Sequence, residues 1–214
     1  MLNDSFKFYY EATKLKDLLR QGAVQWNVSK DRLESIAEHT FGCNILAISL
    51  TSELGLDLDL GRVLEMLTIH ELEEIVIGDV TPLDNIDKKS LKSKARIAVY
   101  KMVKNLDNAD RLMELTDEYN DAQTLESQFA KAIDKLECVL EFKKYQDNGQ
   151  VSLAHLTEDM LKNKKLKNYV DSGKYDLADI FFLFHMPAYE KFGIDENYWF
   201  NNLKNLEIQE VYEK

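Results

Sequence analysis

The chain has 214 residues, of which 45% are apolar and 30% are charged, and its formal net charge at neutral pH is −11. This composition is ordinary for one globular domain. The negative charge repels a phosphate backbone, and no basic cluster with interleaved aromatic residues occurs, so we expect no nucleic-acid partner. A phosphate-bearing ligand would therefore need a metal ion or a few locally placed cations.

No apolar run approaches the roughly 18 residues that span a bilayer, and the first residues lack the apolar core of a secretory signal. We therefore expect a cytoplasmic protein with no membrane partner. The two cysteines, Cys43 and Cys138, lie in helical patterns 95 positions apart, without the Cys and His spacing of a zinc knuckle. We interpret them as small buried side chains and not as a disulfide or a zinc site.

Apolar residues recur at three- and four-residue spacing almost throughout, with only two prolines and eight glycines, which predicts an all-α protein. Gly55 and Gly78 are expected to end the second and third helices. No change of composition marks a linker, so residues 1–150 are predicted to form the core, with residues 151–214 as C-terminal helices packing on the same domain. The expected helices cover about residues 5–20, 33–54, 61–77, 90–106, 109 onward, 124–145, 152–170, 176–192 and 195–208.

The stretch LTIHELEEIVIGDV, residues 67–80, places ionisable residues in an apolar helical pattern. On a helical wheel His70, Glu71 and Glu74 share an arc with apolar residues. Burying an unpaired carboxylate is costly, so this arrangement indicates a positive partner such as a metal ion. Imidazole and carboxylate together suit Mn, Fe, Co, Ni or Zn. The alternative is a buried histidine bonded to a backbone carbonyl, with the glutamates at the rim.

A second histidine, His39, lies near the start of the predicted helix 33–54. Apolar residues are distributed almost completely around that helix, which indicates a central position in the fold. His155 and His185 belong to the later, more amphipathic part of the chain, where a lone histidine is usually structural or solvated. His39 and His70 are therefore the candidate metal ligands.

Three segments, ESIAEHTFG, IHELEEIVIGDVTP and AIDKLE, resemble in order and spacing the motifs of the HD-domain phosphohydrolases, and more narrowly of their small 5′-deoxynucleotidase-like branch. The resemblance covers about residues 15–145 and implies an HD-domain-like helical bundle. It implies one divalent metal ion, with Mn, Co, Fe, Ni, Zn and Mg as candidates, bound by His39, His70, Glu71 and Asp134. Periodicity alone predicts that Asp134 is solvated, because it lies nearly opposite the apolar stripe of its helix.

The resemblance also implies roles for three further residues. Glu74 corresponds to the family's glutamate three residues after the metal-binding acid, and it would transfer a proton. Asp79 belongs to the segment from Gly78 to Pro82 that matches the family's Gly-Asp and Thr-Pro, and it would orient substrate or water; the alternative is an ordinary turn residue. Arg20 corresponds to the arginine that contacts the substrate phosphate.

Two features depart from the family pattern. The ligand pair is His-Glu and not His-Asp, so Glu71, one methylene longer, must shift the ion or bend its own side chain. The aromatic residue that often follows the arginine has no counterpart beside Arg20, and Trp26 is near but displaced. Lys94 and Arg96 are candidates for a second phosphate contact, although an exposed helix face explains them equally well.

The activity implied by the resemblance is metal-dependent hydrolysis of (deoxy)nucleoside 5′-monophosphates to nucleoside and phosphate. One divalent ion would lower the pKa of a bound water and polarise a phosphoryl oxygen, while Arg20 offsets charge on the phosphate. Two alternatives stay open: a non-catalytic HD-like regulatory protein that binds metal or nucleotide, and a hydrolase of another small phosphorylated nucleotide. We expect a small-molecule nucleotide as substrate and a homodimer, and the aromatic residues of 151–214 are expected either to pack on the core or to form the dimer face.

Overall fold

The computed structural model describes residues 2–29, 31–81 and 87–206. Within these ranges the chain is helical, and the only β contact is a bridge between Leu19 and Ser35. The prediction of an all-α protein is confirmed. Every helix in the described ranges is too short or too polar to cross a lipid bilayer. Pro82 and the last two positions of the predicted helix 195–208 lie outside the described residues.

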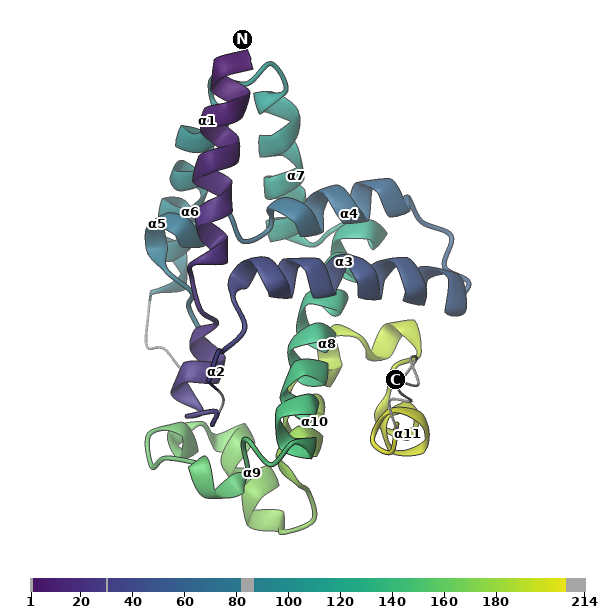
Figure 1. Cartoon of the computed structure of the whole chain (residues 1–214). Coiled ribbons are helices and arrows are strands. Elements are labelled where there is room, and N and C mark those ends of the chain that lie inside the picture. Colours follow the sequence, from purple (N-terminus) through teal and green to yellow (C-terminus); the bar gives the residue numbers. More distant parts are fainter. Residues whose placement is uncertain (1, 30, 82–86, 207–214) are drawn as a thin grey trace, which may run out of the picture.

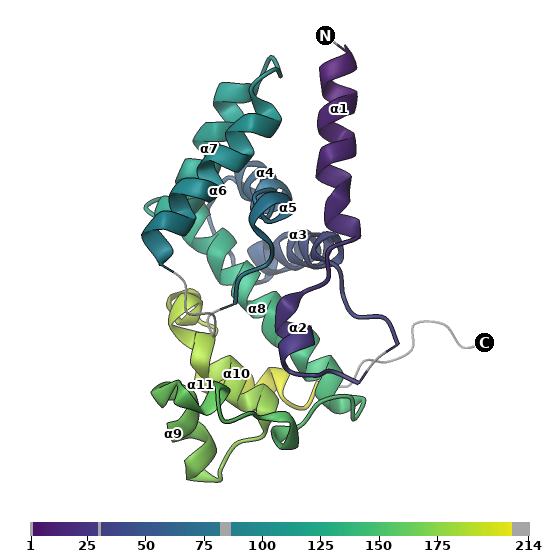
Figure 2. The same ribbon diagram turned by 90° about the vertical axis from the view of Figure 1, so that its left-hand side faces the viewer.

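The helices follow one another through short connections (Figures 1 and 2). The N-terminal part contains α1 (Leu2–Ala12), a 3₁₀ turn (Thr13–Lys16), α2 (Gln21–Gln25), α3 (Ile36–Glu53), α4 (Leu60–Ile69) and α5 (Glu74–Ile77). It continues with α6 (Lys88–Val103), α7 (Ala109–Asp121) and the long α8 (Leu125–Asp147). After 3₁₀ turns at Leu153–His155 and Met160–Lys162, the C-terminal part contains α9 (Lys164–Ser172), α10 (Leu177–His185), 3₁₀ turns at Met186–Ala188 and Glu190–Phe192, α11 (Glu196–Tyr198) and a π-helical turn (Trp199–Leu203).

The predicted helices 33–54, 90–106 and 124–145 are confirmed to within about one turn. The single helix predicted over 61–77 is wrong in its middle, because α4 ends at Ile69 and residues 70–73 form turns before α5 begins. The first helix is shorter than predicted, and only the last part of 152–170 forms an α-helix.

The long helix α8 is the centre of the molecule. α3 and α4 pack on it from one direction, and α10 lies along its C-terminal half (Figures 1 and 2). Because α7 also packs on α8, where Tyr119 contacts Asp134, both the apolar stripe and Asp134 are buried. The periodicity-based prediction that Asp134 is solvated is therefore wrong.

The C-terminal aromatic residues pack on the core. Phe182, Tyr189, Phe192 and Trp199 belong to the same hydrophobic cluster as the buried residues of α3, α4 and α8. The buried carboxylate of Asp179 accepts a hydrogen bond from Trp199 Nε1 at 2.8 Å, so the indole is also held by a polar contact. These four aromatic side chains are thus not free to form a dimer face. The division of the chain at residue 150 stays a prediction.

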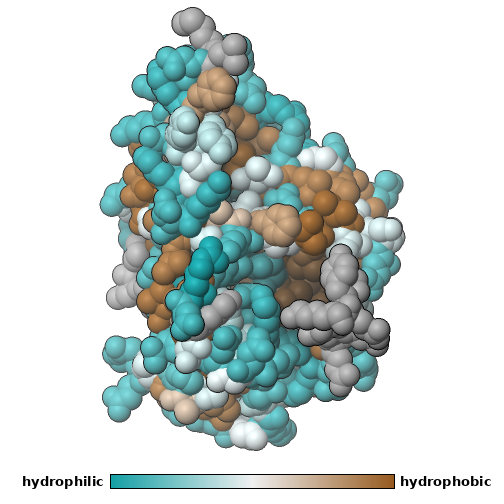
Figure 3. Space-filling view, in the orientation of Figure 1, coloured by the Kyte–Doolittle hydropathy of each residue, from teal (hydrophilic) through white to brown (hydrophobic). Residues whose placement is uncertain are grey.

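The helix that carries His39 begins at a capping box. Ser35 Oγ accepts a hydrogen bond from the Glu38 backbone N–H at 3.3 Å, and the Glu38 side chain accepts one from the Ser35 backbone N–H at 2.9 Å. One face of α3 remains at the surface, where Phe41, Ile45 and Ile48 are 68%, 51% and 48% exposed. Figure 3 shows apolar side chains gathered where α3 and α4 lie. The central position predicted for this helix from its apolar residues is therefore wrong for this face.

Candidate metal centre

The structure brings together His39, His70, Glu71 and Asp134, which come from α3, the turn after α4, and α8. One donor atom of each lies within 4.8 Å of the other three. His39 Nε2 is 3.3 Å from Asp134 Oδ1 and 3.6 Å from Glu71 Oε1, and His70 Nε2 is 3.3 Å from Glu71 Oε1. Ligands placed tetrahedrally at about 2.0–2.2 Å from one ion lie roughly 3.4 Å apart, so these four atoms fit a single metal ion.

The other nitrogen of each imidazole has its own acceptor. His39 Nδ1 lies 2.5 Å from Glu137 Oε2, and His70 Nδ1 lies 2.6 Å from the carbonyl oxygen of Leu67. An N–H directed at each acceptor leaves both Nε2 lone pairs facing the cluster. His70 Nε2 is buried and has no hydrogen-bond partner among the described residues. A buried polar atom without a partner is costly, and a metal ion would satisfy it.

This arrangement decides between the two interpretations of His70. The hydrogen bond to a backbone carbonyl does occur, but it involves Nδ1 and leaves Nε2 for the cluster. Glu74 is buried and Glu71 largely so, so neither glutamate lies at an exposed rim. The donor set therefore fits a metal better than it fits a structural histidine.

The turn between α4 and α5 lets His70 and Glu71 reach one point. Consecutive side chains in a helix diverge by about 100°. Here the N–H groups of Leu72 and Glu74 bond to carbonyls three residues earlier, which replaces regular α-helical geometry. Gly78 then ends α5 with φ of +78°, a conformation that favours glycine, as predicted.

Asp134 presents one oxygen to the cluster and is held by the other. Oδ2 accepts a hydrogen bond from Tyr119 Oη at 2.9 Å and lies 3.0 Å from Lys135 Nζ, whereas Oδ1 faces His39. Burial opposes ionisation, but the attraction of Lys135 and the interaction with His39 outweigh it, so the pKa of Asp134 is held well below its usual value.

Three residues that orient the proposed ligands were missed from sequence. Glu137 follows Asp134 by one helical turn on the same face, a spacing that the sequence contains. Lys135 is adjacent to Asp134 in the same motif. Nothing in the sequence points to Tyr119, because its contact with α8 depends on how α7 packs.

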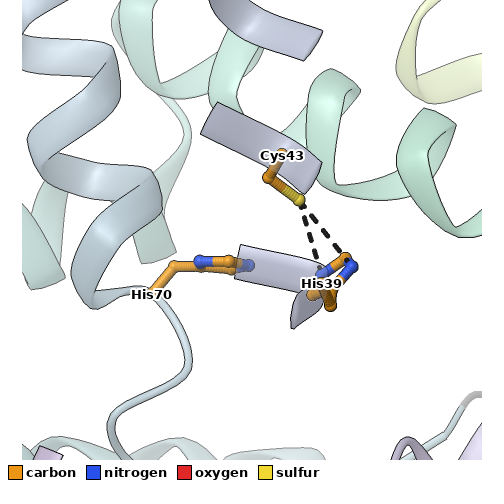
Figure 4. Close-up of side chains that lie close together, drawn as sticks. All are labelled: His39, Cys43 and His70. Carbon is orange, nitrogen blue, oxygen red and sulfur yellow. Dashed lines mark hydrogen bonds between the residues drawn. The ribbon is translucent and has the colours of Figure 1, made fainter. Parts of the chain in front are cut away.

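Cys43 lies beside His39 on α3, while His70 approaches from the end of α4 (Figure 4). The Sγ atom of Cys43 is 3.6 Å from one ring nitrogen of His39 and 3.8 Å from the other, so the sulfur is not aligned with a single lone pair. Burial raises the pKa of the Cys43 thiol to about 12. Both cysteines are free thiols. The interpretation of Cys138 as a buried apolar side chain is wrong, because its Sγ accepts a hydrogen bond from Arg20 Nη2 at 2.9 Å.

A cavity of about 300 Å³ opens beside the cluster, a volume at the lower end of the range for small-molecule sites. His39 is fully buried and lies behind the cavity wall. Lys94 does not line this cavity, and Arg96 forms two hydrogen bonds to Asp117 at the surface. Their candidacy as phosphate contacts is therefore wrong. The predicted site residues that do line the cavity are Arg20, His70, Glu71, Glu74, Asp79 and Asp134.

Arg20 lies between carboxylates at the edge of the cluster. Its Nη1 is 3.4 Å from Glu71 Oε1 and 3.8 Å from Asp79 Oδ2. Asp79 also accepts a hydrogen bond from the backbone N–H of Gln21 at 2.7 Å, so it fixes the first residue of α2 and, with it, Arg20. Burial would lower the pKa of Arg20, but Cys138 and the two carboxylates raise it, and the guanidinium remains charged.

Glu74 and Glu71 experience opposite electrostatic environments. Burial, followed by repulsion from Glu71 and Asp79, raises the pKa of Glu74 to about 11. Its Oε2 is buried without a hydrogen-bond partner among the described residues. For Glu71, burial is outweighed by attraction to His70 and Arg20, so its pKa is lowered. A divalent cation bound here would compensate the negative charge of these closely spaced, buried carboxylates.

His185, which the sequence predicts to be structural or solvated, lines the same cavity, and its burial gives a pH prediction. Burial and then Lys135 lower its pKa to about 4. Because the unfolded chain has a histidine pKa of about 6.5, it binds more protons than the folded chain between these values, and stability falls as the pH decreases through this window, by up to about 1.4 kcal/mol per pH unit. His185→Gln is expected to remove this contribution to the slope, measured by urea unfolding between pH 4 and 7. An unchanged slope in His185→Gln would contradict the prediction.

The chain matches the family model described as HD domain over residues 12–171. It is 25% identical over 201 residues to the 5′-deoxynucleotidase HDDC2 of Dictyostelium discoideum, covering 90% of this chain and 96% of that protein. It is 28% identical over 171 residues to the human 5′-deoxynucleotidase HDDC2, covering 78% of this chain and 76% of that protein.

Solved structures agree with the family match. A predicted metal-dependent phosphohydrolase from Magnetospirillum magnetotacticum MS-1 has a TM-score of 0.61 and 25% identity, covering 90% of this chain and 92% of that one. A conserved hypothetical protein from Pyrococcus furiosus has a TM-score of 0.60 and 25% identity, covering 78% and 97%. Since the family model matches well over half of the sequence, the resemblance is confirmed, and the chain belongs to the HD-domain family.

Proposed function

We propose that this protein is a metal-dependent phosphomonoesterase that acts on (deoxy)nucleoside 5′-monophosphates and releases nucleoside and phosphate. The observation that carries the proposal is the cluster of four candidate metal ligands, three of which line one cavity together with the Arg20 guanidinium. The relatives named 5′-deoxynucleotidase support the substrate class. The homodimer and the cytoplasmic location stay predictions.

His39, His70, Glu71 and Asp134 would hold one divalent ion, with Mn, Co, Fe, Ni, Zn and Mg as candidates. The chemistry that such an ion supplies when bound is polarisation of a phosphoryl oxygen and a lowered pKa for a water molecule. Two imidazole ligands favour a transition metal over Mg, which prefers oxygen ligands.

Arg20 would bind the substrate phosphate. Its planar guanidinium suits two-point contact with phosphate oxygens, and burial among carboxylates keeps it charged and oriented. Asp79 would be a positioning residue, because it holds both Arg20 and the start of α2. Lys131 and Lys135 also line the cavity and add the local positive charge that an acidic protein needs to attract a phosphate.

Glu74 would move the proton. Its Oε2 has no hydrogen-bond partner among the described residues, so it is available to give a proton to the leaving 5′-oxygen or to take one from water. A buried carboxyl with a raised pKa is the usual form of a general acid at neutral pH.

Glu71 provides a prediction about the departure from the family pattern. Because its Oε1 lies 3.3 Å and 3.6 Å from the two imidazole nitrogens, its longer side chain reaches the cluster. Glu71→Asp is expected to keep bound metal and activity, since the carboxylate remains. Glu71→Ala is expected to lower metal affinity by more than 10- to 100-fold, which is the loss typical of removing a residue that only hydrogen-bonds to a metal ligand. Metal content and hydrolysis are measured on the same samples, and wild-type values for both in Glu71→Ala would exclude Glu71 from the ligand set.

The function is tested by a screen of ribo- and deoxyribonucleoside 5′-monophosphates with Mn, Co, Mg and Zn, in which released phosphate is measured. Hydrolysis with at least one transition metal is the expected result. Nucleotide binding without hydrolysis under any condition would instead favour a regulatory binding protein. Hydrolysis confined to other phosphorylated nucleotides would favour the second alternative.

A further inference from the structure

The cavity follows one face of α8 away from the metal-binding cluster. The α8 residues that line it recur at three- and four-residue spacing, as one side of a helix requires. Their chemistry changes from charged to aromatic toward the C-terminal end of the helix. They are Lys131, Asp134, Lys135, Cys138, Glu141, Phe142 and Tyr145.

The helix gives a measure of the length of the site. Phe142 follows Asp134 by two turns and a little more, and at 1.5 Å per residue their Cα atoms are about 12 Å apart along the axis. This separation suits an extended nucleoside monophosphate with its phosphate at Asp134. The nucleoside would then lie between the levels of Lys135 and Phe142.

α10 lies beside this part of α8 and runs in the opposite direction. The Ala178 N–H donates to the Gln146 side chain at 2.8 Å, and Phe181 stacks on Phe142 with ring centroids 4.2 Å apart. Successive turns of α10 therefore approach the metal-binding end, and its cavity-lining residues there come from its last turn. The family match ends at residue 171, so all of α10 lies outside it.

Phe142, Phe181 and Phe184 form an aromatic wall of the cavity. Part of this wall is held in place by buried neighbours, and part is accessible from the cavity. Trp26 is buried and contacts both Phe142 and Phe181, at centroid distances of 5.9 Å and 5.0 Å. Phe184 and His185 line the cavity and are only partly buried. No hydrogen bond to either ring nitrogen of His185 occurs within the described part of the chain.

We propose that α10 supplies the nucleoside-binding part of the site: Phe184 packs against the face of the base, and His185 forms a hydrogen bond to the nucleoside. This proposal rests on the proposed function. A neutral imidazole offers one donor and one acceptor. Burial lowers the pKa of His185 to about 4, so the ring is neutral at pH 7. Because every base has a π-face, stacking is tolerant of base identity, and we expect this wall to select nucleoside phosphates over other phosphomonoesters.

One face of α10 packs in the core and the other lines the cavity, so a residue on the cavity face can be replaced without removing the core packing. Phe182 and Leu183 are buried in the core, whereas Phe184 points to the cavity. Truncating Phe184 therefore keeps the packing that anchors the helix. Phe41→Ala, which removes an exposed aromatic ring from α3, is the matched control.

The test compares deoxynucleoside 5′-monophosphates with 2-deoxyribose 5-phosphate, which has the phosphoester but no base. For Phe184→Ala, the ratio of kcat/KM for nucleotide to kcat/KM for the sugar phosphate is expected to fall about 5- to 100-fold, mainly through the KM for nucleotide. His185→Ala is expected to lower the same ratio by about 2- to 10-fold, the contribution of one hydrogen bond. Phe41→Ala is expected to leave the ratio unchanged. Equal losses on both substrates in Phe184→Ala would overturn the proposal, because they would indicate a structural role.

A binding measurement separates this proposal from the proposed function. Calorimetry with deoxyadenosine in the presence of a chelator tests the nucleoside contact without metal or hydrolysis, and Phe184→Ala is expected to weaken binding by a similar factor. If the wild type hydrolyses no nucleotide but binds deoxyadenosine in a Phe184-dependent way, the function fails and the nucleoside site stands. If the wild type hydrolyses nucleotides and Phe184→Ala changes neither the ratio nor the binding, the nucleoside site fails and the function stands.

Discussion

His70→Ala is expected to give folded protein that retains little metal. The substitution removes Nε2, the buried nitrogen that has no other partner among the described residues and lies 3.3 Å from Glu71 Oε1. Removing a residue that only hydrogen-bonds to a metal ligand typically lowers metal affinity 10- to 100-fold. Removing a ligand itself is therefore expected to lower it by more than about 100-fold. Metal content is measured by elemental analysis after dialysis against a weak chelator.

His155→Ala is the matched control for this experiment. His155 lies in a 3₁₀ turn after α8, where its ring contacts Ser152, and it does not line the cavity. Its removal is expected to leave metal content unchanged. Circular dichroism of both variants establishes that the helices remain. Wild-type metal content in folded His70→Ala would remove His70 from the ligand set and with it the proposed centre.

The helical class and the position of His39 could be predicted because both depend on local sequence. Apolar spacing specifies helices, and the Ser35 and Glu38 pair that begins α3 is a local signal. The break at residues 70–73 could not be predicted in this way. A helical wheel assumes continuous geometry, whereas here the chain leaves α-helical hydrogen bonding so that His70 and Glu71 face one point.

The burial of Asp134 on α8 and the position of His185 on α10 could not be predicted from the spacing of apolar residues. A wheel for α8 places Asp134 opposite the apolar stripe, but helices cover α8 on more than one side, so the polar face is buried as well. Only the resemblance to a family selected this residue. No family motif points to His185, because α10 lies beyond the family match. The approach of α10 to α8 is a tertiary contact, which apolar spacing does not predict.

Glu74→Gln is expected to lower turnover by about 10²- to 10⁴-fold, the range for loss of a general acid–base group. Glutamine keeps the size and the shape of the side chain but can neither give nor take the proton. Glu74 is not among the four donors that lie within 4.8 Å of one another, so metal content is expected to remain near that of the wild type. Hydrolysis, nucleotide affinity and metal content are measured on the same preparation.

The control for Glu74→Gln is Glu73→Gln, one residue earlier in the chain. Glu73 also lines the cavity, and burial and repulsion from Glu71 raise its pKa to about 7. At neutral pH, Glu73→Gln therefore removes part of a negative charge, whereas Glu74, with its pKa raised to about 11, is already protonated and its replacement removes almost none. An electrostatic effect on the cavity as a whole would therefore change turnover at least as much in Glu73→Gln as in Glu74→Gln. Proton transfer at Glu74 Oε2 would lower it only in Glu74→Gln, and the bell-shaped pH profile of kcat would lose one limb in that variant alone. A wild-type rate in Glu74→Gln would exclude this residue from the reaction and leave the proton to another group in the cavity.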